Sequence, residues 1–132
     1  MVGVTLGDPA GVGPELVRKA RKKIGRAMLI EVLGDVGKVR PGHPSIRGAK
    51  AAAEALNLSI SRFKQGRWAA VVNGPISKEW MHRAGFRFPG QTEFYAHAFG
   101  RKADEVTMMM IGPRLRVALA STHLSLRRAV QG

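Results

Sequence analysis

The sequence predicts an α/β fold with a largely parallel sheet. Short apolar runs rich in β-branched residues alternate with helical segments along the 132 residues, and several of these runs end directly at a Gly- or Pro-rich turn. Alternating strands and helices favour crossover connections, and therefore parallel strands. We expect residues 1–132 to form a single α/β segment that is an incomplete part of a larger two-domain enzyme.

The first half of the chain is predicted to contain two strands and two helices. The strands are expected at 2–6 and 27–33. The first helix is expected to begin at Pro14, because proline has no N–H to leave unpaired there, and to end at Gly25. Residues 34–45 are rich in Gly and Pro and predict a loop. A second helix is expected over 46–65.

The second half continues the alternation with shorter elements. A strand is expected over 68–72, followed by a helix over 75–84, again with Pro first and Gly after it. A short helix is expected over 92–99. Two strands at 106–111 and 115–120, separated by a Gly-Pro-Arg turn, precede a final helix over 124–130.

The composition is ordinary except for its charge. The formal net charge is +13 and there are no cysteines, so disulfides and thiolate metal sites are excluded. No apolar run is long enough to span a bilayer and no signal peptide is recognised, so a cytoplasmic location is expected. The cations concentrated at residues 18–26 would attract phosphates, or they form an ordinary solvated helix face.

Ligands of parallel α/β sheets gather at the carboxyl ends of strands, so the turns after Leu6, Val72 and Ala120 are the candidate sites. The first turn carries glycines at 7, 11 and 13, a spacing that matches neither common phosphate-binding signature. It can expose N–H groups at a helix N-terminus, or it is only a tight strand-to-helix corner. Asp8 precedes the helix too far to cap it and can contact a ligand or cap the turn.

The other two turns leave similar alternatives open. Lys78 opposes the dipole of its predicted helix, so it has either an anionic ligand or an ion pair with Glu79 or another carboxylate. Thr92 can cap the next helix, with or without an anion beside it. His123 can be a metal ligand, a general base or a structural residue, and one imidazole alone does not make a metal site.

Three collinear motifs then suggest a family. GDPAGVGPEL near the start, VVNGPISKEWMHRAGFRFPGQTEF in the middle and MMMIGPRLRVALASTHLSLR near the end resemble 4-hydroxythreonine-4-phosphate dehydrogenase. The opening motif is also similar to that of isocitrate and isopropylmalate dehydrogenases, so the resemblance implies part of their fold. It covers most of residues 2–34 and 44–128.

The resemblance implies an NAD-dependent enzyme of pyridoxal phosphate biosynthesis that acts on a phosphorylated small molecule. A hydroxyl of 4-hydroxythreonine 4-phosphate would be oxidised to a ketone, and loss of carbon dioxide would give 3-amino-2-oxopropyl phosphate. A divalent metal, zinc or a similar ion, would polarise the reacting oxygen. The family works as a homodimer. The resemblance does not identify catalytic or NAD-binding residues in this chain.

Some site residues can be transferred by position. His123 matches the first of three histidine metal ligands, and Gln91 and Thr92 match a pair that contacts the substrate phosphate. The family usually has histidine where this chain has Gln91, so relatives acting on other phosphorylated hydroxy acids or on dihydrodiols are relevant. The ligand cleft is expected to include Asp8, Gly11, Gly13 and Lys78.

The resemblance also predicts absences. The family normally carries a long segment between Gly37 and Pro41, and it continues well beyond residue 132 with two further metal-binding histidines and most of the NAD site. We therefore expect a truncated relative that is inactive alone. The alternatives are a non-catalytic remnant that keeps phosphate binding or a dimer surface, and a basic nucleic-acid-binding module, which no recognised binding motif supports.

Overall fold

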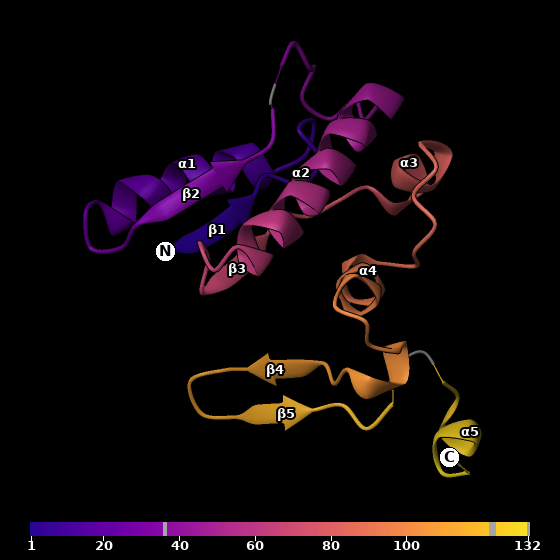
Figure 1. The fold of residues 1–132 in the computed structure, drawn as a ribbon. Coiled ribbons are helices and arrows are strands. Elements are labelled where there is room, and N and C mark those ends of the chain that lie inside the picture. The colour runs from indigo at the N-terminus through magenta and orange to yellow at the C-terminus, as the bar shows by residue number, and fades with distance from the viewer. Residues whose placement is uncertain (36, 122–123, 132) are drawn as a thin grey trace. The chain divides into compact units, whose positions relative to one another are not determined.

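The computed structural model describes residues 1–35, 37–121 and 124–131. The chain divides into two compact units, Met1–Gly90 and Gln91–Gly132, which are described separately (Figure 1). The prediction of a single α/β segment within a larger two-domain enzyme stays a prediction.

The first unit is built on a three-stranded parallel sheet, as the sequence predicts. Its strands are β1 (Val2–Thr5), β2 (Ile30–Leu33) and β3 (Ala70–Asn73), and they lie in the order β2-β1-β3. Val2 is in register with Ile30 on one side and with Ala70 on the other. The strand expected over 27–33 begins three residues later, after a turn that follows the first helix.

The helices of this unit are α1 (Gly13–Ile24), α2 (Ile46–Lys64) and α3 (Lys78–Arg83). Pro14 lies in the first turn of α1, and Gly25 ends that helix with a φ of 56°, as predicted. Ser45 caps α2, because its hydroxyl accepts a hydrogen bond from the N–H of Gly48 at 3.2 Å.

The prediction that a helix begins at Pro75 was wrong. It begins three residues later, at Lys78, after the extended Ser77. The Pro75 carbonyl instead accepts a hydrogen bond from the N–H of Asp8 at 2.9 Å. The contact with the first turn therefore holds residues 74–77 out of the helix.

The core lies between the sheet and one face of α2. The buried residues of α2 recur every three or four positions, as an amphipathic helix requires; they are Gly48, Ala49, Ala52, Ala55, Leu56, Ser59 and Ile60. Small alanines let the helix approach closely. Trp68 and Met81 add the large side chains of this core, at 3% and 1% exposure.

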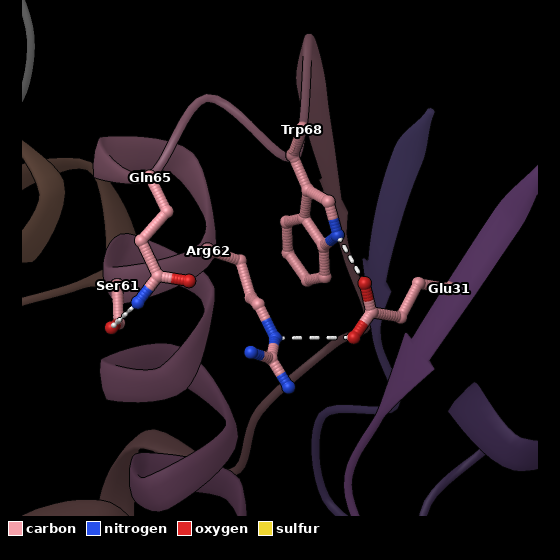
Figure 2. A network of polar contacts seen from close by, with 5 residues as sticks. All are labelled: Glu31, Ser61, Arg62, Gln65 and Trp68. Atoms are coloured by element: carbon pink, nitrogen blue, oxygen red, sulfur yellow. Dashed lines mark hydrogen bonds and ion pairs between the residues drawn. The ribbon is translucent and has the colours of Figure 1, made fainter.

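Glu31 on β2 bonds both to Arg62 of α2 and to Trp68, which follows that helix (Figure 2). A Cβ atom on Gly3 would overlap the indole ring, so the ring occupies the space that the missing side chain leaves. The indole Nε1 donates to Glu31 Oε2 at 2.8 Å, and Arg62 Nε donates to Glu31 Oε1 at 3.1 Å. The hydrogen bond from Trp68, and then the charge of Arg62, hold the pKa of the Glu31 carboxyl below its usual value.

The second unit contains α4 (Gln91–Ala98), a 3-10 turn η1 (Ala103–Glu105), strands β4 (Met109–Ile111) and β5 (Arg116–Ala118), and α5 (Leu126–Ala129). The two strands form an antiparallel hairpin, with Met110 opposite Val117. The turn after Ala120 therefore does not follow a strand of the parallel sheet, and its placement by the rule for parallel sheets was wrong. The cause is the tight turn at 112–115, which reverses the chain and favours antiparallel pairing.

Within the described residues, no helix has the length and apolar character needed to cross a membrane.

Candidate functional site

The turns that follow β1 and β3 meet at the carboxyl edge of the parallel sheet. The N–H of Asp8 donates to the Pro75 carbonyl at 2.9 Å, and the N–H of Gly74 donates to the Thr5 carbonyl at 2.7 Å. The loop before α2 joins them, because the N–H of Gly42 donates to the Ala10 carbonyl at 2.8 Å. Three segments distant in sequence thus form one corner through backbone hydrogen bonds.

The glycines of the corner allow these backbones to approach each other. Gly7 has a φ of 72°, and a Cβ atom there would lie 2.6 Å from the carbonyl carbon of Gly74. A Cβ atom on Gly13 or on Gly74 would overlap the backbone of Leu6. The alternative of a tight corner therefore explains Gly7 and Gly13. Gly11 is exposed and has no comparable steric requirement.

Asp8 caps the turn, which was one of its two predicted roles. Its side chain is buried, and Oδ1 accepts a hydrogen bond from the N–H of Ala10 at 2.9 Å. The first turn of α2 lies against it, since a Cβ atom on Gly48 would be 3.5 Å from the same oxygen. Across the described residues, every buried side-chain nitrogen or oxygen has a hydrogen-bond partner, so the buried carboxylate of Asp8 is paired within the protein.

Lys78 stands at the first position of α3 with an exposed side chain. The ion pair suggested between Lys78 and Glu79 was wrong, because Glu79 pairs with Arg83 at 2.8 Å, one helical turn further on. No ion pair of Lys78 is found in the part of the chain that the structure describes. Its role in binding an anion stays a prediction.

The remaining predicted site residues belong to the second unit. Gln91 is half-buried at the first position of α4, and Thr92 is exposed at the second. The prediction that Thr92 caps this helix was wrong, because the helix begins one residue earlier and places Thr92 inside its first turn. His123 lies outside the described residues. The structure brings Asp8, Gly11 and Gly13 together, and the other assignments remain predictions.

The cationic cluster at residues 18–26 lies along α1 and the turn that follows it. Its members are exposed, and Lys19 donates to Glu15 one turn earlier at 2.6 Å. That hydrogen bond, with the charge of Lys19, lowers the pKa of the Glu15 carboxyl. The face is therefore solvated, and an ion pair this exposed adds little stability.

The described residues do not fit the metal ion that the family resemblance implies. Among residues 1–35, 37–121 and 124–131, no three His, Cys, Asp or Glu side chains form a group able to hold a metal. A zinc site needs at least three protein ligands. We therefore derive no chemical step through a metal in this chain.

Two contributors to the corner were not anticipated from the sequence. Gly42 and Gly48 bring the predicted loop and the start of α2 against the first turn. The only available signal was the density of Gly and Pro over 34–48, which predicts a loop without naming its contacts.

Comparison with known proteins identifies proteins that share this fold and the family to which the chain belongs. This α/β fold is shared with a solved structure from Salmonella typhimurium. The TM-score is 0.84 at 22% identity, over 99% of this chain and 54% of that one. The family model described as pyridoxal phosphate biosynthetic protein PdxA matches residues 11–132. The chain belongs to this family.

Two curated relatives show how much of a family member is present. A 4-hydroxythreonine-4-phosphate dehydrogenase from Zymomonas mobilis is 34% identical, over 98% of this chain and 50% of its own length. A D-threonate 4-phosphate dehydrogenase from Cupriavidus necator is 26% identical, over 99% of this chain and 52% of its own length. The chain thus spans about half the length of the curated relatives it matches. The Zymomonas alignment extends over 168 residues, so that relative has additional residues inside the matched span.

Proposed function

We propose that this chain supplies the N-terminal half of an NAD- and metal-dependent 4-hydroxythreonine-4-phosphate dehydrogenase of pyridoxal phosphate biosynthesis. The match to the family model over residues 11–132 carries the proposal. The Zymomonas relative with that name, aligned to 98% of the chain, supports it. A cytoplasmic location and a homodimer are parts of the same proposal, as are the NAD and the divalent metal that the resemblance implies.

The proposed reaction has two steps. The substrate alcohol would lose a hydride and a proton and become a ketone; NAD, when bound, would supply the acceptor for the hydride. The resulting β-keto acid then loses carbon dioxide and gives 3-amino-2-oxopropyl phosphate. We propose that the corner around Asp8, which backbone hydrogen bonds hold together, lies beside the ligand cleft and helps to shape it.

Phosphate binding is assigned to the start of α4. We propose that Gln91 and Thr92 contact the substrate phosphate there. Lys78, in the first unit, is proposed separately as a residue of the ligand cleft. The first turn of a helix exposes unpaired N–H groups, which favour an anion. Glutamine can donate a hydrogen bond but carries no charge. His123 is proposed as a metal ligand, and its other ligands would have to come from the half that this chain does not span.

A relative of nearly equal coverage raises a second candidate substrate. It is a D-threonate 4-phosphate dehydrogenase, and the departure that the resemblance indicates at Gln91 leaves the choice of substrate open. Both substrates carry a phosphate and a secondary hydroxyl. Oxidation of phosphorylated D-threonate is therefore the second candidate.

Growth of a pyridoxine auxotroph that lacks this dehydrogenase tests the proposal. The strain would receive residues 1–132 fused to the half of the Zymomonas protein that this chain does not span. The fusion should restore growth without pyridoxine, and the Thr92→Ala fusion should weaken it. Ser61→Ala, on the exposed side of α2, is the matched control and should grow as the parent does.

Three other results have distinct meanings. Failure of the folded fusion to restore growth would contradict the proposal and favour the non-catalytic remnant. Activity of the purified fusion on D-threonate 4-phosphate alone would assign the second substrate. Tight, salt-sensitive binding of the unfused chain to DNA or RNA in a gel shift would support the nucleic-acid module instead.

A further inference from the structure

The cationic cluster carries more charge than helix α1 requires. Its members are exposed, and they are Arg18, Lys19, Arg21, Lys22, Lys23 and Arg26. Cations in the last turn of a helix stabilise its negative end, which explains some of them. In the described part of the chain, Glu15 is the one carboxylate that pairs with the cluster, through Lys19 at 2.6 Å. The other members of the cluster have no ion pair there.

The spacing of the cluster opposes helix formation. Arg18 and Lys22 are four residues apart within α1, and so are Lys19 and Lys23. Residues at this spacing lie one turn apart on the same side of a helix, and like charges there destabilise it. An anionic partner would remove this repulsion, so the cluster is better suited to binding a polyanionic surface than to water alone.

Apolar side chains beside the cluster narrow the class of partner. Met28 and Leu29 follow the cluster in sequence and precede β2, and they are 50% and 72% exposed. Together with Arg21 and Arg26 they line a surface hollow of about 370 Å³. Guanidinium groups bind phosphates through paired N–H donors. The hollow can therefore contact phosphate groups and apolar chains at the same time.

A nucleic acid would use only the charged part of this surface. Its phosphates would contact the cations, but unpaired bases stack on aromatic side chains, and none of the described residues that line the hollow is aromatic. A membrane of anionic phospholipids presents phosphates directly above acyl chains. Lys and Arg side chains reach such phosphates while neighbouring apolar side chains enter the acyl boundary. The combination of groups favours the lipid surface.

We propose that the cationic cluster, together with Met28 and Leu29, binds the surface of a membrane that contains anionic phospholipids. The cations contact the lipid phosphates, and the two apolar side chains enter the boundary between headgroups and acyl chains. Membrane binding requires neither substrate nor cofactor, so the inference goes beyond the proposed function and can fail separately from it.

Flotation of the full chain with lipid vesicles tests the proposal. Vesicles of phosphatidylcholine alone are compared with vesicles that contain roughly one third phosphatidylserine, which carries the negative surface charge. The variant Arg21→Gln/Lys22→Gln removes two charges from the cluster. Arg47→Gln/Lys50→Gln removes two charges from exposed positions of α2 and is the matched control. An effect of net charge alone would be equal in the two variants.

The apolar contact has its own pair of variants. Leu29→Gln removes the most exposed apolar side chain of the hollow, and Leu58→Gln makes the same change on α2, where the side chain is 44% exposed. Both positions are already exposed, so neither substitution removes a core side chain. Circular dichroism of every variant checks its fold.

We expect the chain to float with the phosphatidylserine vesicles and to stay unbound with phosphatidylcholine alone. Arg21→Gln/Lys22→Gln should lower the partition coefficient at least about tenfold, and the control pair on α2 less than about twofold. Leu29→Gln should lower it at least about threefold, because contact with the acyl boundary is lost, and Leu58→Gln should leave it unchanged.

Four results would overturn the proposal. They are no flotation with phosphatidylserine vesicles, equal binding to both kinds of vesicle, equal losses in the two double variants, and unchanged binding of Leu29→Gln. Tighter binding to single-stranded RNA than to the vesicles, with no effect of Leu29→Gln, would also overturn it, because a nucleic acid would then be the partner.

Discussion

Replacement of Gly3 by alanine should destabilise the first unit, and the cause should be overlap of the added methyl group with Trp68. The Cβ atom of Gly3→Ala would overlap the indole ring, which is 3% exposed and hydrogen-bonded to Glu31. Overpacking of this kind costs about 1–3 kcal/mol. The first unit has about 90 residues, and each kcal/mol shifts the Tm of a domain of that size by about 4–8 °C. The Tm should therefore fall by at least about 4 °C.

A double-mutant cycle isolates the cause. Trp68→Ala should cost about 3–5 kcal/mol by itself, because it leaves a cavity. In that background Gly3→Ala has free space and should be neutral or stabilising, so the coupling energy should be at least about 1 kcal/mol. Thermal and urea unfolding followed by far-UV circular dichroism gives all four stabilities without relying on the fluorescence of the residue removed.

Gly112→Ala is the matched control, since its nearest neighbour, the Leu115 carbonyl oxygen, would lie at an ordinary 3.4 Å. It should change stability by no more than about 0.5 kcal/mol. Gly3→Ala with an unchanged Tm, or strict additivity of Gly3→Ala and Trp68→Ala, would refute the packing of the indole against Gly3.

Further predictions concern the corner and the Glu31 carboxyl. Gly7→Ala should lower the free energy of unfolding by at least about 1–2 kcal/mol in urea titrations, because a φ of 72° is left-handed. Asp8→Ala should cost about 1–3 kcal/mol, because the buried N–H of Ala10 loses its acceptor, whereas Asp8→Asn, which keeps an oxygen, should cost less. Trp68→Phe should raise the pKa of Glu31, measured by carbon NMR of the carboxyl. Since folding lowers this pKa, the stability that Glu31 contributes is present above pH 4.5 and is lost as the pH falls below it; an unfolding midpoint independent of pH across that window would count against the network.

The order of elements in the first unit could be predicted because each one has a local cause. Pro14 and Gly25 bound α1, and the alanines of 49–55 favour a helix that packs closely. The start of α3 could not be predicted in this way. Pro75 is a good first residue for a helix, but its carbonyl is engaged by Asp8, almost seventy residues earlier in the chain, and such a contact leaves no local signal in the sequence.

In the candidate site, too, the sequence predicted some features and could not predict others. The sequence indicated that the glycines of the first turn had a role, and it left a ligand cradle and a tight corner open. The close approach of Gly13 and Gly74 to the Leu6 backbone favours the tight corner. This approach is visible in the structure and not in the sequence. The charge of α1 was equally ambiguous, because a solvated face and an anion-binding face have the same composition.

NADH formation by purified protein tests most directly the proposal that this chain is one half of a dehydrogenase of phosphorylated hydroxy acids. The chain alone and its fusion to the unspanned half of the Zymomonas relative would each receive 4-hydroxythreonine 4-phosphate, NAD and zinc. The fusion should produce NADH continuously, and residues 1–132 alone should produce none. Sustained turnover by the unfused chain, or a folded fusion that binds substrate and never reduces NAD, would contradict it.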